Sequence, residues 1–308
     1  MEEFRMLSKD GKTKLACYCV FPAEKEPRAV FQIVHGMCEY FGRYEDYAKT
    51  LAAAGILVVG HDHLGHGNSA PTADDLGFTA AGGGADFLVE DVYALTEKVK
   101  EDYPDVPVIL FGHSMGSFIA REVLARHGDA YRAAIICGTG GPEAPAGAGK
   151  AMANTLMAFR GERHRSKLLK NIAFAGYMKM TEKGAPANAW LTHDYKIVDK
   201  YNADPFCTYT FTLRAYHDLF TLVAWANDKK WAEKLPKDLP CYVTAGEEDP
   251  VGAFGKGPRT VADRMVAAGM KNVTLKMWPG MRHEILNEIG KEEVYREMNE
   301  WVFAQLPN

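Results

Sequence analysis

Hydrophobic and polar positions follow two different patterns along the chain. Short, mainly apolar runs predict strands that are buried on both faces of a sheet, at residues 29–34, 56–59, 108–111, 133–137, 241–245 and 273–277. Between them, apolar residues recur at helical spacing, which predicts helices at residues 44–54, 85–99, 117–127, 216–225, 260–268 and 292–305. Before this alternation, residues 4–7 and 14–21 flank an Asp10-Gly11 turn and predict a β-hairpin.

The order of these elements predicts the fold class. A hairpin followed by strands that alternate with helices indicates an α/β protein with a mostly parallel, eight-stranded sheet and helices on both faces. The alternation breaks after Pro142, and no buried strand is evident up to about residue 216. We therefore predict one α/β core in two parts, residues 1–141 and 217–308, with an inserted helical cap at residues 142–216.

Composition and charge narrow the class of protein. Of the 308 residues, 47% are hydrophobic and 25% charged, which is typical of globular proteins, and the net charge of −4 argues against a nucleic-acid-binding surface. The charged N-terminus does not resemble a signal peptide, and no apolar run is long enough to span a bilayer. Six dispersed cysteines predict free thiols in a reducing cytoplasm: Cys17, Cys19, Cys38, Cys137, Cys207 and Cys241.

The sequence Gly-His-Ser-Met-Gly at residues 112–116 is the strongest chemical signal. It follows a predicted buried strand and opens a predicted helix, the context that separates a nucleophile turn from a chance match. The turn at Ser114 is expected to be strained, with Gly112 and Gly116 keeping side chains away from the neighbouring backbone. We predict that Ser114 is a nucleophile at the N-terminus of a helix.

A serine nucleophile needs a base, and the base needs a carboxylate to orient it. Both are expected after later strands, in the order Ser, Asp, His. Asp249 follows the strand at 241–245, and His283 follows the strand at 273–277. Glu247 and Glu248 are rival acids, but Asp249 lies deepest in its loop, directly before Pro250. The predicted triad is Ser114, Asp249 and His283.

The oxygen of a tetrahedral intermediate needs two backbone N–H donors. One is expected from Met115, the residue after the nucleophile. The other is expected from the loop after the strand at 29–34, where His35-Gly36-Met37 suits this role with Met37 as the donor. Because the donors are backbone groups, their side chains need not be polar.

Several motifs together resemble the monoacylglycerol lipase and lysophospholipase branch of the α/β-hydrolases. They are HGMCE and GRY at residues 35–39 and 42–44, DHLGHGNS at 62–69, GHSMG at 112–116 and YNADP at 201–205, whereas residues 142–191 match poorly. The resemblance implies the α/β-hydrolase fold and the same triad and oxyanion donors. It adds Glu39, Arg43 and Tyr201 as polar contacts near a glycerol-like head of the substrate.

One position departs from this branch. Its lipases tend to carry a second histidine three residues after the catalytic one, where this chain has Leu286. With Leu286 among the substrate-binding candidates, we expect an esterase with little preference for a glycerol leaving group. Its rate should rise with acyl length, because methionine and phenylalanine residues of the cap offer an apolar wall.

The sequence therefore predicts a serine carboxylic-ester hydrolase that forms an acyl-enzyme with a lipid-like or small acyl ester, without a metal or organic cofactor. An N-acyl amidase, a small-peptide serine aminopeptidase and a non-catalytic ligand binder with the same fold remain alternatives.

Two further features have simpler explanations. The histidines at 61, 63 and 66 suggest a metal site, but Gly65 stands where a metallohydrolase pattern needs aspartate. The basic residues at 160–170 predict a solvated cap face, with transient contact to anionic lipid as the alternative.

Overall fold

A computed structural model describes residues 1–23, 26–142 and 146–307. Residues 143–145, at the start of the predicted cap, lie outside the described residues. The strands are β1 (Glu2–Leu7), β2 (Lys14–Val20), β3 (Ala29–Val34), β4 (Ile56–His61), β5 (Val108–His113), β6 (Ala133–Cys137), β7 (Cys241–Gly246) and β8 (Val273–Trp278). The α-helices are α1 (Glu45–Ala53), α2 (Gly84–Asp102), α3 (Met115–His127), α4 (Ala146–Arg160), α5 (Lys167–Ala173), α6 (Tyr195–Ala203), α7 (Leu213–Ala226), α8 (Lys256–Ala267) and α9 (Lys291–Ala304).

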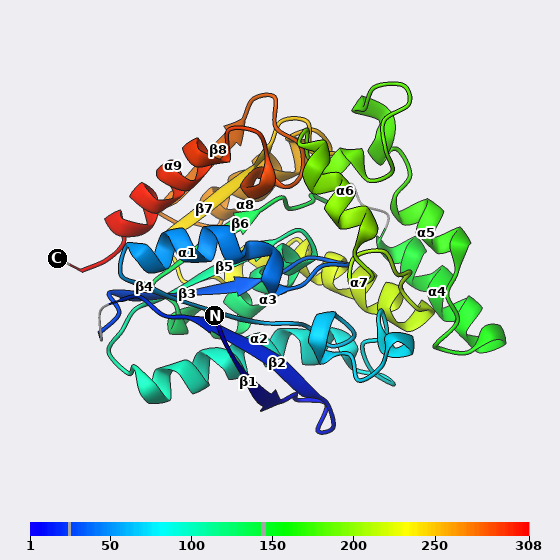
Figure 1. Cartoon of the computed structure of the whole chain (residues 1–308), viewed down its shortest axis with the longest axis horizontal. Helices are drawn as coiled ribbons and strands as arrows, with labels where there is room; N and C mark the ends of the chain where they lie inside the picture. Colours follow the sequence, from blue (N-terminus) through cyan, green and yellow to red (C-terminus); the bar gives the residue numbers. More distant parts are fainter. Residues whose placement is uncertain (24–25, 143–145, 308) are drawn as a thin grey trace.

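The eight strands form one sheet in the order β1-β2-β4-β3-β5-β6-β7-β8 (Figure 1). β1 pairs with β2 and β2 with β4 in antiparallel fashion, and the remaining pairs are parallel. The predicted eight-stranded, mostly parallel sheet of an α/β-hydrolase is therefore confirmed. Because β3, β5, β7 and β8 are parallel, the loops after their carboxyl ends meet along one edge of the sheet, where sites form in this type of fold.

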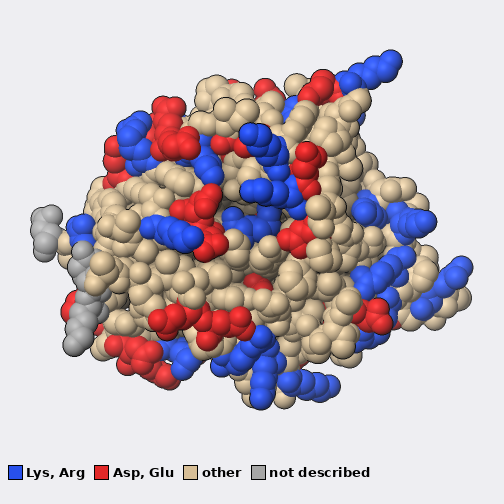
Figure 2. All heavy atoms as spheres, in the orientation of Figure 1, with Lys and Arg blue, Asp and Glu red and all other residues tan. Residues whose placement is uncertain are grey.

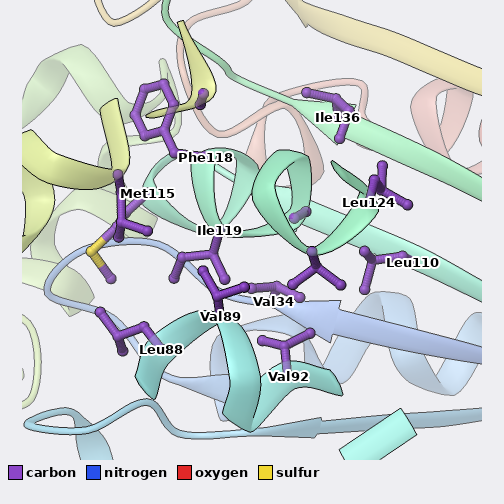
Figure 3. Close-up of a cluster of buried hydrophobic side chains, with 14 of the residues drawn as sticks. Val34, Leu88, Val89, Val92, Leu110, Met115, Phe118, Ile119, Leu124 and Ile136 are labelled. Carbon is purple, nitrogen blue, oxygen red and sulfur yellow. The ribbon is translucent and has the colours of Figure 1, made fainter. Parts of the chain in front are cut away.

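Alternate residues of each central strand pack on opposite faces of the sheet. Phe31 and Ile33 of β3 join one core cluster with α1 and α9, whereas Val30 and Val34 join another with α2, α3 and α7. Figure 3 shows part of the second cluster, in which Val89 and Val92 of α2 and Ile119 of α3 lie together with Val34 and Leu110 of the sheet. This two-sided burial explains why the parallel strands are apolar at nearly every position.

Helices α4, α5 and α6 lie together on one side of the molecule, beyond the edge that carries the site (Figure 1). We call residues 146–212, which contain these helices, the cap segment. α7 begins at Leu213, three residues before the predicted start, because the Thr212 side chain caps it by accepting a hydrogen bond from the backbone N–H of Ala215. α8 likewise begins at Lys256, before the predicted residue 260.

The six cysteines are free thiols, as predicted. Among the described residues, no helix is both long and apolar enough to cross a membrane. On the face shown in Figure 2, acidic and basic side chains are mixed over most of the surface, and basic ones gather over α4 and α5.

Candidate active site

Ser114 lies in a sharp turn between β5 and α3. Its backbone has φ 54° and ψ −121°, a strained conformation for a residue with a side chain. A Cβ atom at Gly112 would collide with the carbonyl of Gly116, and one at Gly116 would collide with that of Val34. The two glycines therefore allow the chain to turn within one residue, and the turn presents Ser114 at the N-terminal end of α3.

Asp249 and His283 lie side by side beyond the ends of β7 and β8. Oδ1 of Asp249 is 2.9 Å from Nδ1 of His283 and also accepts a hydrogen bond of 2.8 Å from the N–H of Val251. Both side chains are buried. The two loops pack tightly at Gly246, where a Cβ atom would collide with the carbonyls of Met281 and Arg282.

The rival carboxylates of this loop point elsewhere. Glu247 lies 3.7 Å from Arg259 at the surface, and Glu248 lies 3.2 Å from Nε2 of His193 in the cap segment. Of the three acids after β7, Asp249 is therefore the one beside His283.

The two predicted oxyanion donors flank Ser114. Met115 is the first residue of α3, and Met37 follows β3 in the neighbouring loop; both line the same cavity as Ser114 and His283. Within the described residues, no hydrogen bond from the N–H of Met37 or Met115 is found. Both N–H groups therefore lack an acceptor among the described residues.

The cavity has a volume of about 460 Å³ and is lined by two chemically different groups of residues. Its larger part is apolar and is lined from α3, the cap segment and α7: Phe118, Met152, Ile172, Phe174, Leu219, Phe220 and Val223. The other group consists of Glu39, Arg43, Tyr201 and Glu284, which contact one another; we call this group the polar end. Of the methionine and phenylalanine residues predicted to form an apolar wall in the cap, Met152 and Phe174 line the cavity.

The polar end is a buried network of charges. Arg43 makes two hydrogen bonds of 2.6 and 2.7 Å to the carboxylate of Glu284 and one of 3.0 Å to Glu39, and its guanidinium lies 4.9 Å from the ring centre of Tyr201. Burial raises the pKa of the Glu39 carboxyl, but hydrogen bonding to His113 and the charges of His113 and Arg43 outweigh this and hold that pKa well below its usual range. Glu39 is therefore a carboxylate at neutral pH.

Glu284 and His113 are parts of this site that the sequence did not indicate. Glu284 follows His283 directly but lies 241 positions from its partner Arg43, and no short motif links residues so far apart. Nδ1 of His113 lies 3.2 Å from Oε1 of Glu39, and its Nε2 lies 3.3 Å from the carbonyl of His283. His113 thus connects the polar network with the loop that carries His283.

Leu286 requires a correction. Its side chain is buried in the core cluster with Ile285, Val294 and Tyr295, and it is not among the residues that line the cavity. The backbone turns after Glu284 into a short 3-10 helix, which directs Leu286 toward α9. The prediction of Leu286 as a substrate-binding residue is therefore wrong, and Glu284 lines the polar end of the cavity instead.

The histidines at 61, 63 and 66 are buried and bond within the protein. Nδ1 of His63 lies 3.2 Å from Nε2 of His61, and the backbone N–H of His63 donates to Nε2 of His35. Burial lowers the pKa of His61 and His66 to about 4. In the part of the chain that the structure describes, no group of histidine, cysteine or carboxylate side chains is arranged to hold a metal ion.

This fold and this arrangement of serine, histidine and aspartate define the class: the chain is a serine hydrolase with the α/β-hydrolase fold. A family model described as "Serine aminopeptidase, S33" matches residues 25–290, and the chain belongs to this family.

Known hydrolases of this class align with this chain over most of its length. The chain is 27% identical over 289 residues to the monoacylglycerol lipase of Mycolicibacterium smegmatis, covering 94% of this chain and 93% of that protein. It is 28% identical over 281 residues to the monoglyceride lipase of Mus musculus, covering 90% and 82%. The crystal structure of a highly thermostable carboxyl esterase from Bacillus coagulans in complex with glycerol has a TM-score of 0.92 to this structure at 31% identity, covering 98% of each chain.

Proposed function

We propose that this protein is a carboxylic-ester hydrolase of the monoacylglycerol lipase type that uses Ser114, His283 and Asp249 as its catalytic triad. The observation that carries the proposal is the 2.9 Å approach of Asp249 to Nδ1 of His283, on a cavity that Ser114 also lines. Relatives named as monoacylglycerol lipases, and a neighbour named as a carboxyl esterase, support an ester as the substrate.

The mechanism follows from these positions. His283 takes the proton of Ser114 as the hydroxyl attacks the acyl carbon, and the N–H groups of Met37 and Met115 bind the oxyanion. The His283 imidazolium, stabilised by Asp249, then protonates the leaving alcohol, which departs and leaves the acyl group on Ser114. Water attacks the acyl-enzyme by the same steps and releases the acid.

The two ends of the cavity fit the two parts of a monoacylglycerol. The apolar end accommodates the acyl chain, with each buried methylene contributing about 0.8 kcal/mol. Glu39, Arg43, Tyr201 and Glu284 surround the polar end, where the hydroxyls of a glycerol leaving group would find acceptors and donors. The complex of the Bacillus coagulans carboxyl esterase with glycerol is consistent with a head site of this kind in the present chain.

An aminopeptidase, the activity in the name of the family model, fits the polar end less well. Recognition of a free amino terminus requires a carboxylate that is available to an ammonium group. Among the described residues, the carboxylates on the cavity are Glu39 and Glu284, and Arg43 binds both. We therefore favour a neutral alcohol as the leaving group.

We also propose that the cap segment contacts anionic lipid surfaces transiently. Phe159, Leu168 and Met180 are exposed apolar residues of this segment, with relative exposures of 82, 55 and 56%. Exposed Arg160, Lys167 and Lys170 lie beside them in the sequence. Arg163 and Arg165 do not contribute in the same way, because they bind Asp75 and the carbonyl of Asp74 at the surface of the α/β part of the chain.

The lipid contact is tested by co-sedimentation with phosphatidylcholine vesicles that contain or lack phosphatidylglycerol. A Phe159→Ser, Leu168→Ser variant should sediment less with the anionic vesicles, whereas Val266→Ser, an exposed apolar residue of α8 (59%), should not change binding. Equal binding of all three proteins would contradict a cap contact.

The hydrolase proposal is tested by labelling with a fluorophosphonate and by turnover of monoacylglycerols. Ser114→Ala should abolish both while leaving the melting temperature nearly unchanged, because only a hydroxyl is lost. Removal of a triad member typically lowers kcat by roughly 10⁴–10⁶-fold. Turnover by the variant within tenfold of the wild type would exclude Ser114 as the nucleophile.

A further inference from the structure

The loop that carries His283 is built against the cap segment rather than against the core alone. The N–H of Glu284 donates to the carbonyl of Leu191 at 2.7 Å, and the ring of His283 packs on that of Trp190 with 5.1 Å between centroids. Arg282, directly before His283, is buried and donates to the carbonyl of Ala189 at 2.8 Å. Residues 189–191 thus contact three consecutive residues around the proposed base.

The loop that carries Asp249 also contacts this part of the cap segment, through Val251, which packs against the cluster that contains Trp190 and Leu191, and through His193. Nε2 of His193 lies 3.2 Å from Oε2 of Glu248, the residue before Asp249. Nδ1 of His193 lies 2.9 Å from Oε1 of Glu288, and the backbone N–H of His193 donates to the same carboxylate. Glu288 in turn accepts a hydrogen bond of 2.9 Å from the N–H of Arg282.

His193 therefore bridges the two loops from the cap side. One ring nitrogen reaches the acid's loop at Glu248, and the other reaches Glu288, which binds the base's loop at Arg282. Its side chain is one-third exposed, whereas that of Glu288 is almost fully buried. His193, Glu248, Arg282 and Glu288 do not line the cavity, so any effect on the reaction would pass through the residues that do.

We propose that His193 is a positioning residue that fixes the relative placement of Asp249 and His283. This inference rests on the proposed triad and goes beyond it, because it makes the cap segment part of the machinery that orients the acid–base pair. The two loops also contact each other directly, through a 2.9 Å hydrogen bond from the N–H of Glu248 to the carbonyl of Met281 and through Glu248 and Arg282 at 4.0 Å, so His193 adds a second link between them from the cap side. Misplacement of reacting groups by about 1 Å can cost on the order of 100-fold in rate.

The test compares His193→Ala with His193→Gln, which retains one N–H donor for a carboxylate, and with His164→Ala, an exposed histidine of the cap segment. For His193→Ala we expect kcat and the rate of fluorophosphonate labelling to fall about tenfold with KM within twofold of the wild type. His193→Gln should recover part of the loss, and His164→Ala should match the wild type.

Two results would overturn the proposal. The first is wild-type kcat and labelling rate in His193→Ala. The second is a loss of activity in proportion to a loss of folded protein, measured by thermal unfolding under the assay conditions, with no recovery in His193→Gln. A wrong assignment of the triad gives a different result: the fluorophosphonate would then still label the Ser114→Ala variant.

Discussion

Arg43 and Glu284 are 241 positions apart in the sequence and form a bidentate ion pair in the wall of the cavity. Arg43 follows the loop after β3, which provides Met37, and Glu284 follows His283. The pair therefore connects the side of the site that would bind the oxyanion with the side that carries the proposed base. Both side chains are at least nine-tenths buried, so if one is removed, water cannot easily solvate the charge that remains.

Removal of Glu284 should be costly for stability. In Glu284→Ala, Arg43 would keep only Glu39 as its carboxylate partner, and breaking a buried pair in this way typically costs about 3–5 kcal/mol. Glu284→Gln should cost less, because the amide oxygen can still accept from Arg43. Urea unfolding gives the free energies; as a control, Glu247→Ala at the surface should change the free energy of unfolding by less than about 0.5 kcal/mol. Equal stability of Glu284→Ala and Glu247→Ala would contradict the structural role of the pair.

Substitution of the three acids after β7 tests which one orients His283. Asp249→Asn leaves the shape of the site intact but removes the charge 2.9 Å from Nδ1, and an equivalent change in other triads lowers kcat by about 10⁴-fold. Glu247→Gln should leave kcat unchanged. Glu248→Gln should have an intermediate effect, because it weakens the contacts with His193 and Arg282 but leaves Asp249 in place. If steady-state kinetics find Glu248→Gln the most damaging of the three, the assignment of Asp249 is wrong.

Asp91 should make the stability of the fold depend on pH. This buried residue of α2 accepts hydrogen bonds from Ser8 and from the N–H of Lys9, and burial raises its pKa to about 7. The folded protein therefore binds a proton at this site between about pH 4 and 7, where the unfolded chain does not. This group alone makes the free energy of unfolding rise as the pH falls from 7 toward 4, and its contribution is lost above pH 7.

Asp91→Asn removes this titration and retains an acceptor for the N–H of Lys9. The variant should gain stability relative to the wild type at pH 8, on the order of 1 kcal/mol, and the gain should shrink by pH 5. Thermal unfolding of both proteins at the two values of pH measures the difference. A difference between the two proteins that does not change with pH would rule out a raised pKa at Asp91.

Local sequence patterns predicted the fold and the parts of the site that depend on strand ends. Ser114, Asp249 and His283 each follow a predicted buried strand, and parallel strands bring such loops to one edge, so their proximity was foreseeable. The family resemblance suggested Glu39, Arg43 and Tyr201 for the polar end, but Glu284 could not be predicted, because its contact with Arg43 depends on the path of the chain after His283. The same path removed Leu286 from the cavity, although its sequence position relative to His283 suggested a contact with substrate.

The residues at the polar end of the cavity should favour a glycerol leaving group. A buried hydroxyl without a hydrogen-bond partner costs about 1–3 kcal/mol, which corresponds to roughly 5- to 150-fold in kcat/KM. Because Glu284, Glu39, Arg43 and Tyr201 line that end, we expect a monoacylglycerol to be hydrolysed at least about fivefold more efficiently than the ethyl ester of the same acid.

Tyr201→Phe removes one hydroxyl and should lower kcat/KM for the glyceride about 2- to 10-fold while leaving kcat/KM for the ethyl ester nearly unchanged. Both esters are assayed below their aggregation limits, so that the apolar end of the cavity contributes equally to each. Equal rates for the two esters in the wild type, or an equal loss for both in Tyr201→Phe, would mean that the leaving group does not occupy this end.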